Sequence, residues 1–341
     1  MGERRVRYHL LALAVVLVWG VTFVCTKVLI GAGLHPVDIF WIRFVLAYLG
    51  IWLYILLTGR DRTLWYGWKE ELVFLFLGIT GGSFYFLTEN TALAHTQASN
   101  VSFLVCSAPL FTALFTLLYR RFGRGRFADS LEKVRLGWPL IGGTVLALAG
   151  MALVAFEGSR LRLSPLGDLL AIGAALCWAL YSLFMGEMTN RYGTVTATRK
   201  VFFYGLLTII PFLFGSDRGF SLELLRPFPV WGNLLFLGLV ASLACFIAWN
   251  LVIDKLGNVS STNYVYLNPV FTLLTATLFL GERMTPLAAL GCAAILAGVI
   301  WAGARPSDAT EGAAIAKHQG YTGQMHRRFV PPPAHLDECH P

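Results

Sequence analysis

A few charged side chains interrupt long apolar stretches of this sequence, and they are the first candidates for chemistry. Lys27, Asp38, Arg43, Glu89 and His95 come from three such stretches. In the centre of a membrane an unpaired charge costs about 2.5 to 3.5 kcal/mol on insertion scales, so pairing Glu89 with Arg43 or Lys27 would remove a real penalty. Lys27 and Asp38 lie close enough to the ends of their stretches to reach water, which favours a structural role. Arg43 and Glu89 lie deeper, so functional and structural roles both stay open.

Two prolines, Pro109 and Pro269, fall in the middle of apolar stretches of helical length. A proline inside a helix removes a backbone donor and frees a carbonyl, so we expect both helices to kink or break. In lipid the freed carbonyl needs a polar partner or a water-lined cavity. The polar neighbours that we expect at such a cavity are Ser107, Thr112, Asn263, Tyr266 and Asn268. The alternative is a pair of tolerated kinks at a packed interface.

Aromatic side chains offer a further binding surface. Trp19 and Trp178 occupy equivalent positions in the middle of two apolar stretches, too deep for the aromatic belt at a membrane surface. Tyr181 lies one helical turn from Trp178 and adds a hydroxyl. These rings could stack on a planar or cationic ligand. Ordinary packing is the alternative, and an aromatic content of 14% favours it.

The composition places these residues in a membrane. Of 341 residues, 56% are hydrophobic and only 13% are charged, which is more apolar surface than one water-soluble core can hide. The apolar stretches are about 20 residues long, and a helix of that length spans a hydrocarbon core of roughly 30 Å. We therefore predict an all-α integral membrane protein with ten transmembrane helices. The predicted spans are residues 8–30, 36–57, 72–94, 98–119, 138–156, 165–188, 195–214, 230–256, 260–280 and 286–301.

The chain also contains an internal repeat. Residues 76–119 align without a gap with residues 236–279 at a constant offset of 160, which pairs Asn90 with Asn250 and Pro109 with Pro269. Five spans per repeat is an odd number, so the second repeat enters from the opposite side and the repeat is inverted. Secondary transporters commonly use inverted halves, which bind substrate near the middle of the membrane and alternate the side that is open. Asn90 and Asn250 then lie at mirrored depths, and we expect both at the cavity.

The basic residues predict the orientation. With alternate loops assigned to one side, 20 Lys and Arg residues fall on the side of the N-terminus and five on the other. Basic loops stay in the cytoplasm, so we expect both termini to be cytoplasmic. The net charge of +8 then reflects topology, and we predict no nucleic-acid partner. The predicted domains are two five-helix repeats, 8–156 and 165–303, and a disordered cytoplasmic tail, 304–341, whose apolar content is too low for a fold.

Sequence motifs for other chemistry are absent. The six cysteines have no metal or disulfide spacing, and the chain has no Walker or Rossmann glycine motif and nothing that resembles a Ser-His-Asp, zinc or haem site. We therefore predict no catalytic residues, no metal and no cofactor. Pairs of small residues with four-residue spacing are expected to bring helices close together, and they are Gly78 with Gly82, Gly143 with Ala147, and Ala294 with Gly298.

Two segments resemble the EamA repeats of the drug/metabolite transporter superfamily. They read ENTALAHTQASNVSFLVCSAPLFTALFTLL in the first half, and NYVYLNPVFTLLTATLFLGERMT followed by LGCAAILAGVIWA in the second. The similarity covers residues 8–303, and the positions Asn90, Pro109, Pro269 and Gly281-Glu282 match jointly. Glu282 has no acidic counterpart in the first half, so we interpret it as a capping or loop residue.

The resemblance implies a carrier in the bacterial inner membrane, with a central cavity formed by predicted helices 1 to 4 and 6 to 9. Family members mostly export amino acids and related metabolites, or drugs. Weakly charged cavity candidates favour a small zwitterion or an aromatic metabolite over a polyphosphate, which needs several inward cations. Arg43 and Glu89 could form a gate as an ion pair, or Glu89 could bind a proton that couples export to the gradient. Energy coupling, transport direction and oligomeric state stay open.

Other function classes fit the same composition. A passive channel needs no alternating halves, and turnover separates the two because a carrier saturates at a low rate. A lipid-carrier flippase, also known in the superfamily, needs a lateral opening. A membrane-embedded enzyme ordinarily presents a cluster of His, Asp or Glu at the interface, whereas the longest cytoplasmic loop, 120–137, is mainly basic. An enzyme is therefore the least favoured class.

Overall fold

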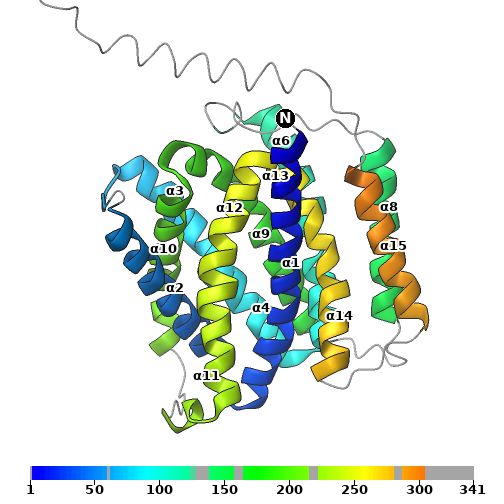
Figure 1. The fold of residues 1–341 in the computed structure, drawn as a ribbon, viewed down its shortest axis with the longest axis horizontal. Helices are drawn as coiled ribbons and strands as arrows, with labels where there is room; N and C mark the ends of the chain where they lie inside the picture. Colours follow the sequence, from blue (N-terminus) through cyan, green and yellow to red (C-terminus); the bar gives the residue numbers. More distant parts are fainter. Residues whose placement is uncertain are drawn as a thin grey trace, which may run out of the picture. The chain divides into compact units, whose positions relative to one another are not determined.

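Helices make up all the regular structure in the part of the chain that is described, as the sequence predicts (Figure 1). The structure is a computed structural model that describes residues 2–59, 62–123, 125, 127, 138–156, 164–214, 222–279 and 286–303. The described helices all belong to one compact unit, Met1–Gly303. The predicted tail, most of the basic loop at 120–137, and Gly281 and Glu282 lie outside the described residues.

The helices of the first half follow the predicted spans. They are α1 (Gly2–Gly31), α2 (Pro36–Thr58), α3 (Trp68–Gly78), a π-helical segment (Ile79–Ser83), α4 (Phe84–His95), α5 (Ala98–Val105), α6 (Ala108–Phe122) and α8 (Trp138–Phe156). Local chemistry sets the bounds of α2. Pro36 stands in the first turn, where its missing N–H is not needed, and the His35 ring accepts a hydrogen bond from the amide of Val37. Gly59 ends the helix with φ of 64°, a conformation that favours glycine.

The second half repeats this pattern. It contains α9 (Pro165–Tyr192), α10 (Thr194–Phe214), a 3₁₀ turn (Leu222–Leu225), α11 (Phe228–Leu235), a π-helical segment (Phe236–Ala244), α12 (Cys245–Leu256), α13 (Asn258–Thr262), a 3₁₀ segment (Asn263–Leu267), α14 (Asn268–Phe279) and α15 (Pro286–Gly303). Ser164 caps α9, because its hydroxyl accepts a hydrogen bond from the amide of Gly167 at 3.3 Å.

Within the described residues, seven helical stretches are long and apolar enough to cross a membrane, and they match the predicted spans 1 to 4 and 6 to 8. Their bounds are Val6–Gly31, Pro36–Thr58, Trp68–His95, Ala98–Phe122, Pro165–Tyr192, Thr194–Phe214 and Phe228–Leu256. Shorter apolar helices, Ile141–Leu153 and Ala289–Trp301, lie within α8 and α15. The stretch from α13 to α14 is interrupted by its 3₁₀ segment. The chain is therefore a multi-pass membrane protein, and the count of ten spans stays a prediction.

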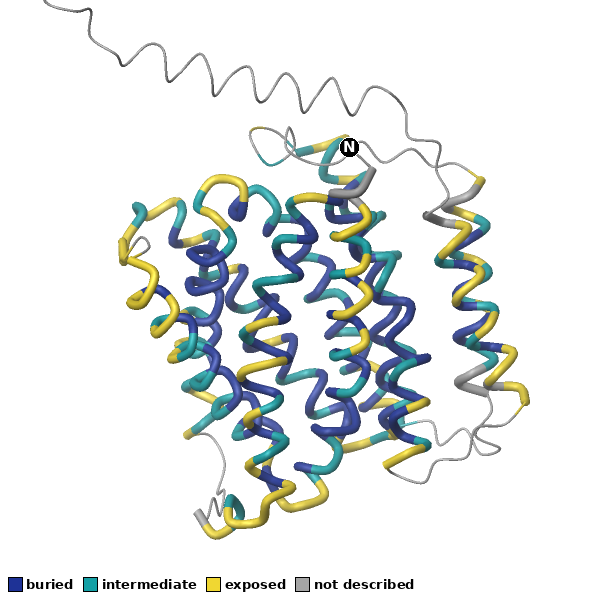
Figure 2. The backbone as a smooth tube through the Cα atoms, viewed as in Figure 1, coloured by how far each residue is buried: buried dark blue, intermediate teal, exposed yellow. Residues whose placement is uncertain are grey.

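Exposed residues lie along the outer helices of the bundle (Figure 2), and many of them are large and apolar. On α1, for example, Leu10 and Leu17 are exposed, whereas Val16 and Phe23 are buried. A helix that is hydrophobic on its exposed face suits contact with lipid rather than water. The sequence-based prediction of a membrane protein agrees with this surface.

Small residues bring helices together at the predicted motifs. α8 and α15 lie side by side (Figure 1), and a Cβ added to Gly298 would come within 2.5 Å of the carbonyl oxygen of Gly143. On the other side of the bundle, a Cβ added to Gly82 would lie 3.1 Å from the Cα of Gly205 in α10. The predicted close approach is confirmed at both motifs.

The two π-helical segments occupy equivalent positions in the repeat. At the offset of 160, Ile79–Ser83 falls inside Phe236–Ala244. A π turn bonds each carbonyl one residue further along than an α turn does, which rotates the helix that follows it. Such turns are frequent at functional sites. Here they precede α4 and α12, and both of these helices contribute to the cavity described next.

Candidate functional site

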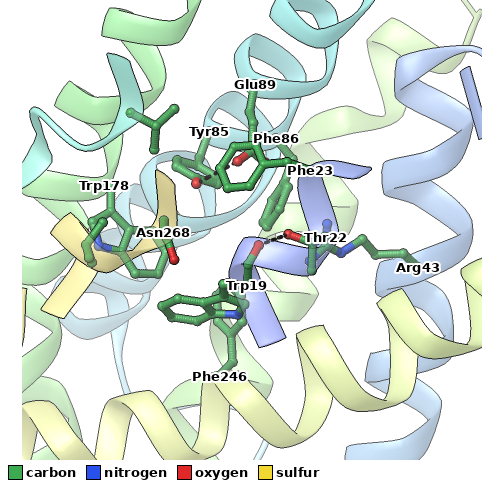
Figure 3. Close-up of a pocket in the computed structure, with 12 residues that line it drawn as sticks. Trp19, Thr22, Phe23, Arg43, Tyr85, Phe86, Glu89, Trp178, Phe246 and Asn268 are labelled. Carbon is green, nitrogen blue, oxygen red and sulfur yellow. Dashed lines mark hydrogen bonds between the residues drawn. The ribbon is translucent and has the colours of Figure 1, made fainter. Parts of the chain in front are cut away.

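A cavity lies among the helices, lined by twelve residues (Figure 3). Both halves of the chain contribute to it. The lining residues are Trp19, Thr22, Phe23, Arg43, Tyr85, Phe86, Glu89 and Val105 from the first half, and Trp178, Phe246, Val265 and Asn268 from the second. The walls are thus mostly aromatic, with one cation and one anion.

The cation is Arg43 of α2, whose side chain is 2% exposed. Its Nε donates a hydrogen bond of 2.6 Å to the hydroxyl of Ser242, and its guanidinium carbon lies 4.2 Å from the centre of the Phe86 ring. A cation over an aromatic face is attracted by the electrons of the ring. No ion pair with Arg43 occurs among the described residues, so its charge is held by a neutral hydroxyl and a ring.

The anion is Glu89 of α4, which is 6% exposed. One carboxylate oxygen accepts a hydrogen bond of 3.0 Å from the hydroxyl of Tyr85, one helical turn earlier on the same face. Figure 3 shows Glu89 and Arg43 entering the cavity from different helices. Neither of the ion pairs considered from the sequence, Glu89 with Arg43 or with Lys27, is found among the described residues. Lys27 instead donates to the carbonyl oxygens of Leu93 and Thr96.

Aromatic rings from equivalent positions of the two halves pack against one another in the cavity lining. Trp19 and Trp178 meet edge to face, with ring centroids 5.2 Å apart. The ring centroid of Phe246 lies 6.0 Å from that of Trp19 and 6.3 Å from that of Phe86, the repeat counterpart of Phe246. These are favourable aromatic geometries, so the rings stabilise one another by packing. Together they form an apolar surface, here called the aromatic floor, on which a ligand can stack. Both tryptophans line the cavity, and they also pack against each other.

Two polar atoms of the lining have no hydrogen-bond partner within the described part of the chain. They are the indole Nε1 of Trp178 and the side-chain carbonyl Oδ1 of Asn268, and both residues are 4% exposed. A buried donor or acceptor without a partner is costly, and most native structures satisfy such groups. The cavity therefore offers one donor and one acceptor to a ligand.

The two predicted helix breaks are present. Between α5 and α6 the chain turns at Cys106 and Ser107, just before Pro109, and the 3₁₀ segment before α14 ends just before Pro269. The carbonyl freed by a proline belongs to the residue four positions earlier. These residues are Val105 and Val265, and both line the cavity.

One freed carbonyl has an identified partner. The thiol of Cys106 lies 3.0 Å from the carbonyl oxygen of Val265 and donates to it. The break in the first half therefore contacts the break in the second half directly. This contact ties the two interrupted helices together beside the cavity.

The π-helical segment of the second half holds two cavity residues in place. The Trp19 indole donates a hydrogen bond of 3.1 Å to the carbonyl oxygen of Ala241, and Ser242 accepts from Arg43. A π turn supplies carbonyls that are not used in the ordinary helical pattern. The wide turn at Phe236–Ala244 thus positions a tryptophan and an arginine that come from α1 and α2.

Several residues expected at the cavity lie elsewhere. Asn90 is fully buried and donates to the carbonyl oxygen of Pro36 at 3.1 Å. Asn250 accepts from the Tyr181 hydroxyl at 2.7 Å and donates to the Thr198 hydroxyl at 2.8 Å. These amides link helices through side-chain hydrogen bonds, and Oδ1 of Asn90 has no partner among the described residues. The expected residues outside the cavity lining are Asn90, Ser107, Pro109, Thr112, Tyr181, Asn250, Asn263, Tyr266 and Pro269.

The hydroxyls of Ser107 and Thr112 are used locally. Each donates to a backbone carbonyl of its own helical stretch, that of Leu104 or Ala108, at 2.7 and 2.9 Å. Such bonds satisfy a hydroxyl within one helix and commonly bend it. These side chains therefore support the break near Pro109 rather than face the cavity.

Some lining residues were missed by sequence reasoning. The lining residues that were not singled out are Thr22, Phe23, Tyr85, Phe86, Val105, Phe246 and Val265. Two signals were available for part of this set. Tyr85 stands four residues before Glu89, and Val105 and Val265 are repeat counterparts at the offset of 160. The described part of the chain contains no group of three or more His, Cys, Asp or Glu that could hold a metal ion.

A second polar cluster, outside the cavity lining, joins α3 to α10. Lys200 lies 2.6 and 2.8 Å from the two carboxylate oxygens of Glu71 and also donates to the carbonyl oxygen of Leu64. The hydroxyl of Tyr204 and the backbone amide of Tyr66 donate to the same carboxylate at 2.6 and 2.9 Å. Both charged side chains are buried. This cluster anchors the link between α2 and α3.

Comparison with known proteins agrees with the fold and identifies a family. A family model described as the EamA-like transporter family matches residues 6–124 and 165–304. A probable terminal-alkyne amino-acid exporter of Streptantibioticus cattleyicolor is 28% identical over 223 residues, which cover 65% of this chain and 70% of that protein. A probable amino-acid metabolite efflux pump of Salmonella typhimurium is 26% identical over 301 residues, which cover 85% of this chain and 92% of that protein.

A solved crystal structure shares the fold. Its TM-score is 0.65 at 19% identity, and the match covers 87% of this chain and 98% of that one. The family match extends over both halves of the chain and includes the helices that line the cavity. The resemblance found in the sequence is thereby confirmed, and the chain belongs to the EamA-like transporter family.

Proposed function

We propose that this chain exports an amino acid or a closely related small metabolite across the inner membrane of a bacterium, as a secondary transporter. The observation that carries the proposal is the buried cavity, which both halves of the chain line and which presents one cation and one anion. Two similar proteins named as a probable amino-acid exporter and efflux pump support the substrate class and the direction. The bilayer and the small molecule are its expected partners, and no catalytic step is proposed.

The proposed architecture is a pair of inverted five-helix repeats, 8–156 and 165–303, with ten spans and cytoplasmic termini. The gapless repeat and the paired π-helical segments support the duplication. The asymmetry of 20 basic residues against five supports the orientation. With this orientation, α3 starts and α9 ends at the cytoplasmic side.

Alternating access then has a physical basis. Arg43 and Glu89 lie toward the outer side of the aromatic floor, whereas the cluster of Glu71 and Lys200 lies toward the cytoplasm. We propose that the buried ion pair of Glu71 and Lys200 holds the inner side closed. Opening it requires these contacts to separate, and inverted halves allow the mirrored motion on the other side.

Arg43 and Glu89 are the proposed gating and coupling residues. When the cavity is empty, movement of α2 toward α4 would let the two charges pair and close the outer side. Alternatively, Glu89 would take up a proton during the cycle, because a buried carboxylate is easier to keep neutral than charged. The variants Glu89→Gln and Glu89→Gln with Arg43→Gln distinguish these roles. A gate pair is partly restored in the double variant, whereas a proton site stays uncoupled.

Metabolite profiling of the medium tests the export of amino acids. We expect one or a few amino acids to accumulate outside cells that overproduce the protein and to be depleted outside a deletion strain. The same compounds should exchange across proteoliposomes that contain the purified chain, with saturable kinetics. Flux that rises without saturation would identify a channel instead, and movement of labelled lipid without amino-acid exchange would identify a flippase. Unchanged amino acids in both strains would refute the proposed substrate class.

A further inference from the structure

We infer that Arg43 and Glu89 bind the two charged groups of a zwitterionic substrate, Arg43 its carboxylate and Glu89 its ammonium group. This inference rests on the proposed function, and it adds the residues that select the substrate. The two charges belong to one cavity but come from different helices, α2 and α4. Each is buried and each has only neutral hydrogen-bond partners among the described residues.

The bonding capacity of both groups is incompletely used. A guanidinium carries five N–H donors in a planar fork, and the structure uses its Nε toward Ser242. A carboxylate has about four acceptor positions, and Tyr85 occupies one at Glu89. The free side of a guanidinium fork matches a carboxylate with two parallel bonds. The remaining positions of a carboxylate match the three donors of an ammonium group.

The rest of the cavity fits the same ligand. The Trp178 indole can donate one more bond and the Asn268 carbonyl can accept one, and neither has a partner in the described part of the chain. The Phe86 ring already lies against the Arg43 guanidinium, and Trp19 and Phe246 supply an apolar floor. A side chain of the substrate can therefore pack on the rings while its charged ends stay paired.

Selection follows from the burial of both charges. A molecule that lacks the carboxylate or the ammonium group leaves Arg43 or Glu89 buried without a charged partner. Such a ligand displaces the water around that side chain but does not replace the hydrogen bonds of the water. Truncating one side of a buried charge pair typically weakens binding by about 30-fold or more. A cavity with one cation and one anion thus favours molecules with both groups over simple amines, simple acids and molecules with several like charges.

Analogue binding to the full-length protein in lipid nanodiscs tests the inference. The twenty common amino acids are screened first, and the one that binds most tightly is compared with the amine that lacks its carboxylate and the acid that lacks its amino group. In the wild type we expect both analogues to bind at least about 30-fold more weakly than the amino acid. The measured quantities are the two affinity ratios, not the affinity itself.

The variants are expected to change one ratio each. In Arg43→Gln the amino acid and the amine should bind within about 3-fold of each other, while the acid still binds weakly. In Glu89→Gln the acid should approach the amino acid, while the amine still binds weakly. Arg43→Lys keeps a cation and should keep most of the discrimination, which covers the case in which Arg43→Gln does not fold. Lys27→Gln removes a cation that binds backbone carbonyls outside the cavity lining, and both ratios should stay as in the wild type.

The outcomes separate this inference from the proposed function. If an amino acid binds but both ratios are unchanged in Glu89→Gln, and also in Arg43→Gln where that variant folds, the clamp is overturned and amino-acid transport stands. If the two variants each change both ratios equally, the residues act on the shape of the cavity and the clamp is also overturned. If no amino acid binds more tightly than its two analogues in the wild type, the clamp and the proposed substrate class both fail.

Discussion

Replacement of Lys200 by methionine is expected to destabilise the protein by about 3 kcal/mol, because it leaves the buried Glu71 carboxylate without its cation. Loss of one partner from a buried ion pair typically costs about 3 to 5 kcal/mol. Glu71 keeps two neutral donors in the variant, the hydroxyl of Tyr204 and the amide of Tyr66, so the cost should lie at the lower end of that range. The carbonyl of Leu64 also loses its donor.

The assay is the thermal unfolding midpoint of purified protein in detergent. In soluble domains of comparable size, 1 kcal/mol shifts the midpoint by about 2 to 4 °C, so a loss of roughly 5 °C or more is expected. The double variant Glu71→Gln with Lys200→Met should recover most of this loss, since it removes the orphaned charge and keeps the hydrogen bonds of Tyr204 and Tyr66.

Lys255 offers a matched control in the same chain. It pairs with Asp254 at 2.7 Å, but its side chain is 46% exposed. Exposed pairs contribute about 0 to 1 kcal/mol, so Lys255→Met should leave the midpoint nearly unchanged. The reasoning is refuted if Lys200→Met lowers the midpoint no more than this control, or if the double variant is less stable than Lys200→Met alone.

Two further predictions concern the proposed mechanism and topology. Pro109→Ala and Pro269→Ala restore backbone N–H groups that can bond the freed carbonyls, so each should straighten a broken helix. Both variants should lower transport several-fold at unchanged protein abundance. Normal transport by both would show that the helix breaks are not part of the mechanism. In a variant without native cysteines, Ala32→Cys should react with an impermeant thiol reagent in intact cells and Asn190→Cys should not, and the reverse pattern would invert the proposed orientation.

Most of the fold can be predicted from the sequence, because a long apolar segment in a membrane can adopt few structures. A stretch of about 20 apolar residues forms a helix so that its backbone groups bond internally, and seven of the predicted spans have that form. The breaks at Pro109 and Pro269 are also predictable, since a proline has no N–H to give. The two π-helical segments were not predicted, because a wide turn is set by packing of the whole helix and leaves no pattern in hydropathy.

The cavity residues were predictable only in part, because the π-helical turns that orient them leave no pattern in the sequence. Arg43, Glu89, Trp19 and Trp178 attract notice by residue type and depth, and all four line it. Asn90 has the same qualities, yet its amide faces the carbonyl of Pro36 instead. Depth along a helix can be read from sequence, but the direction of a side chain around the helix depends on turns such as Ile79–Ser83. An amide is also satisfied by backbone carbonyls that a sequence pattern does not reveal.

The lining of the cavity combines a symmetric frame with asymmetric charge. Trp19 and Trp178, Phe86 and Phe246, and Val105 and Val265 are three pairs of equivalent positions that line it. Glu89 breaks the symmetry, because its counterpart at the offset of 160 is Trp249, a buried indole.

A duplicated frame lets the two halves exchange conformations at similar energy, which alternating access requires. Because the charge of Glu89 is present in only one half, the bound substrate has a single orientation relative to the membrane. In the proposed orientation, the charged ends of the substrate therefore stay on the outer side of the aromatic floor, and its side chain points toward the cytoplasm. Bulky substituents on the side chain should consequently affect entry from the cytoplasm more than release to the outside.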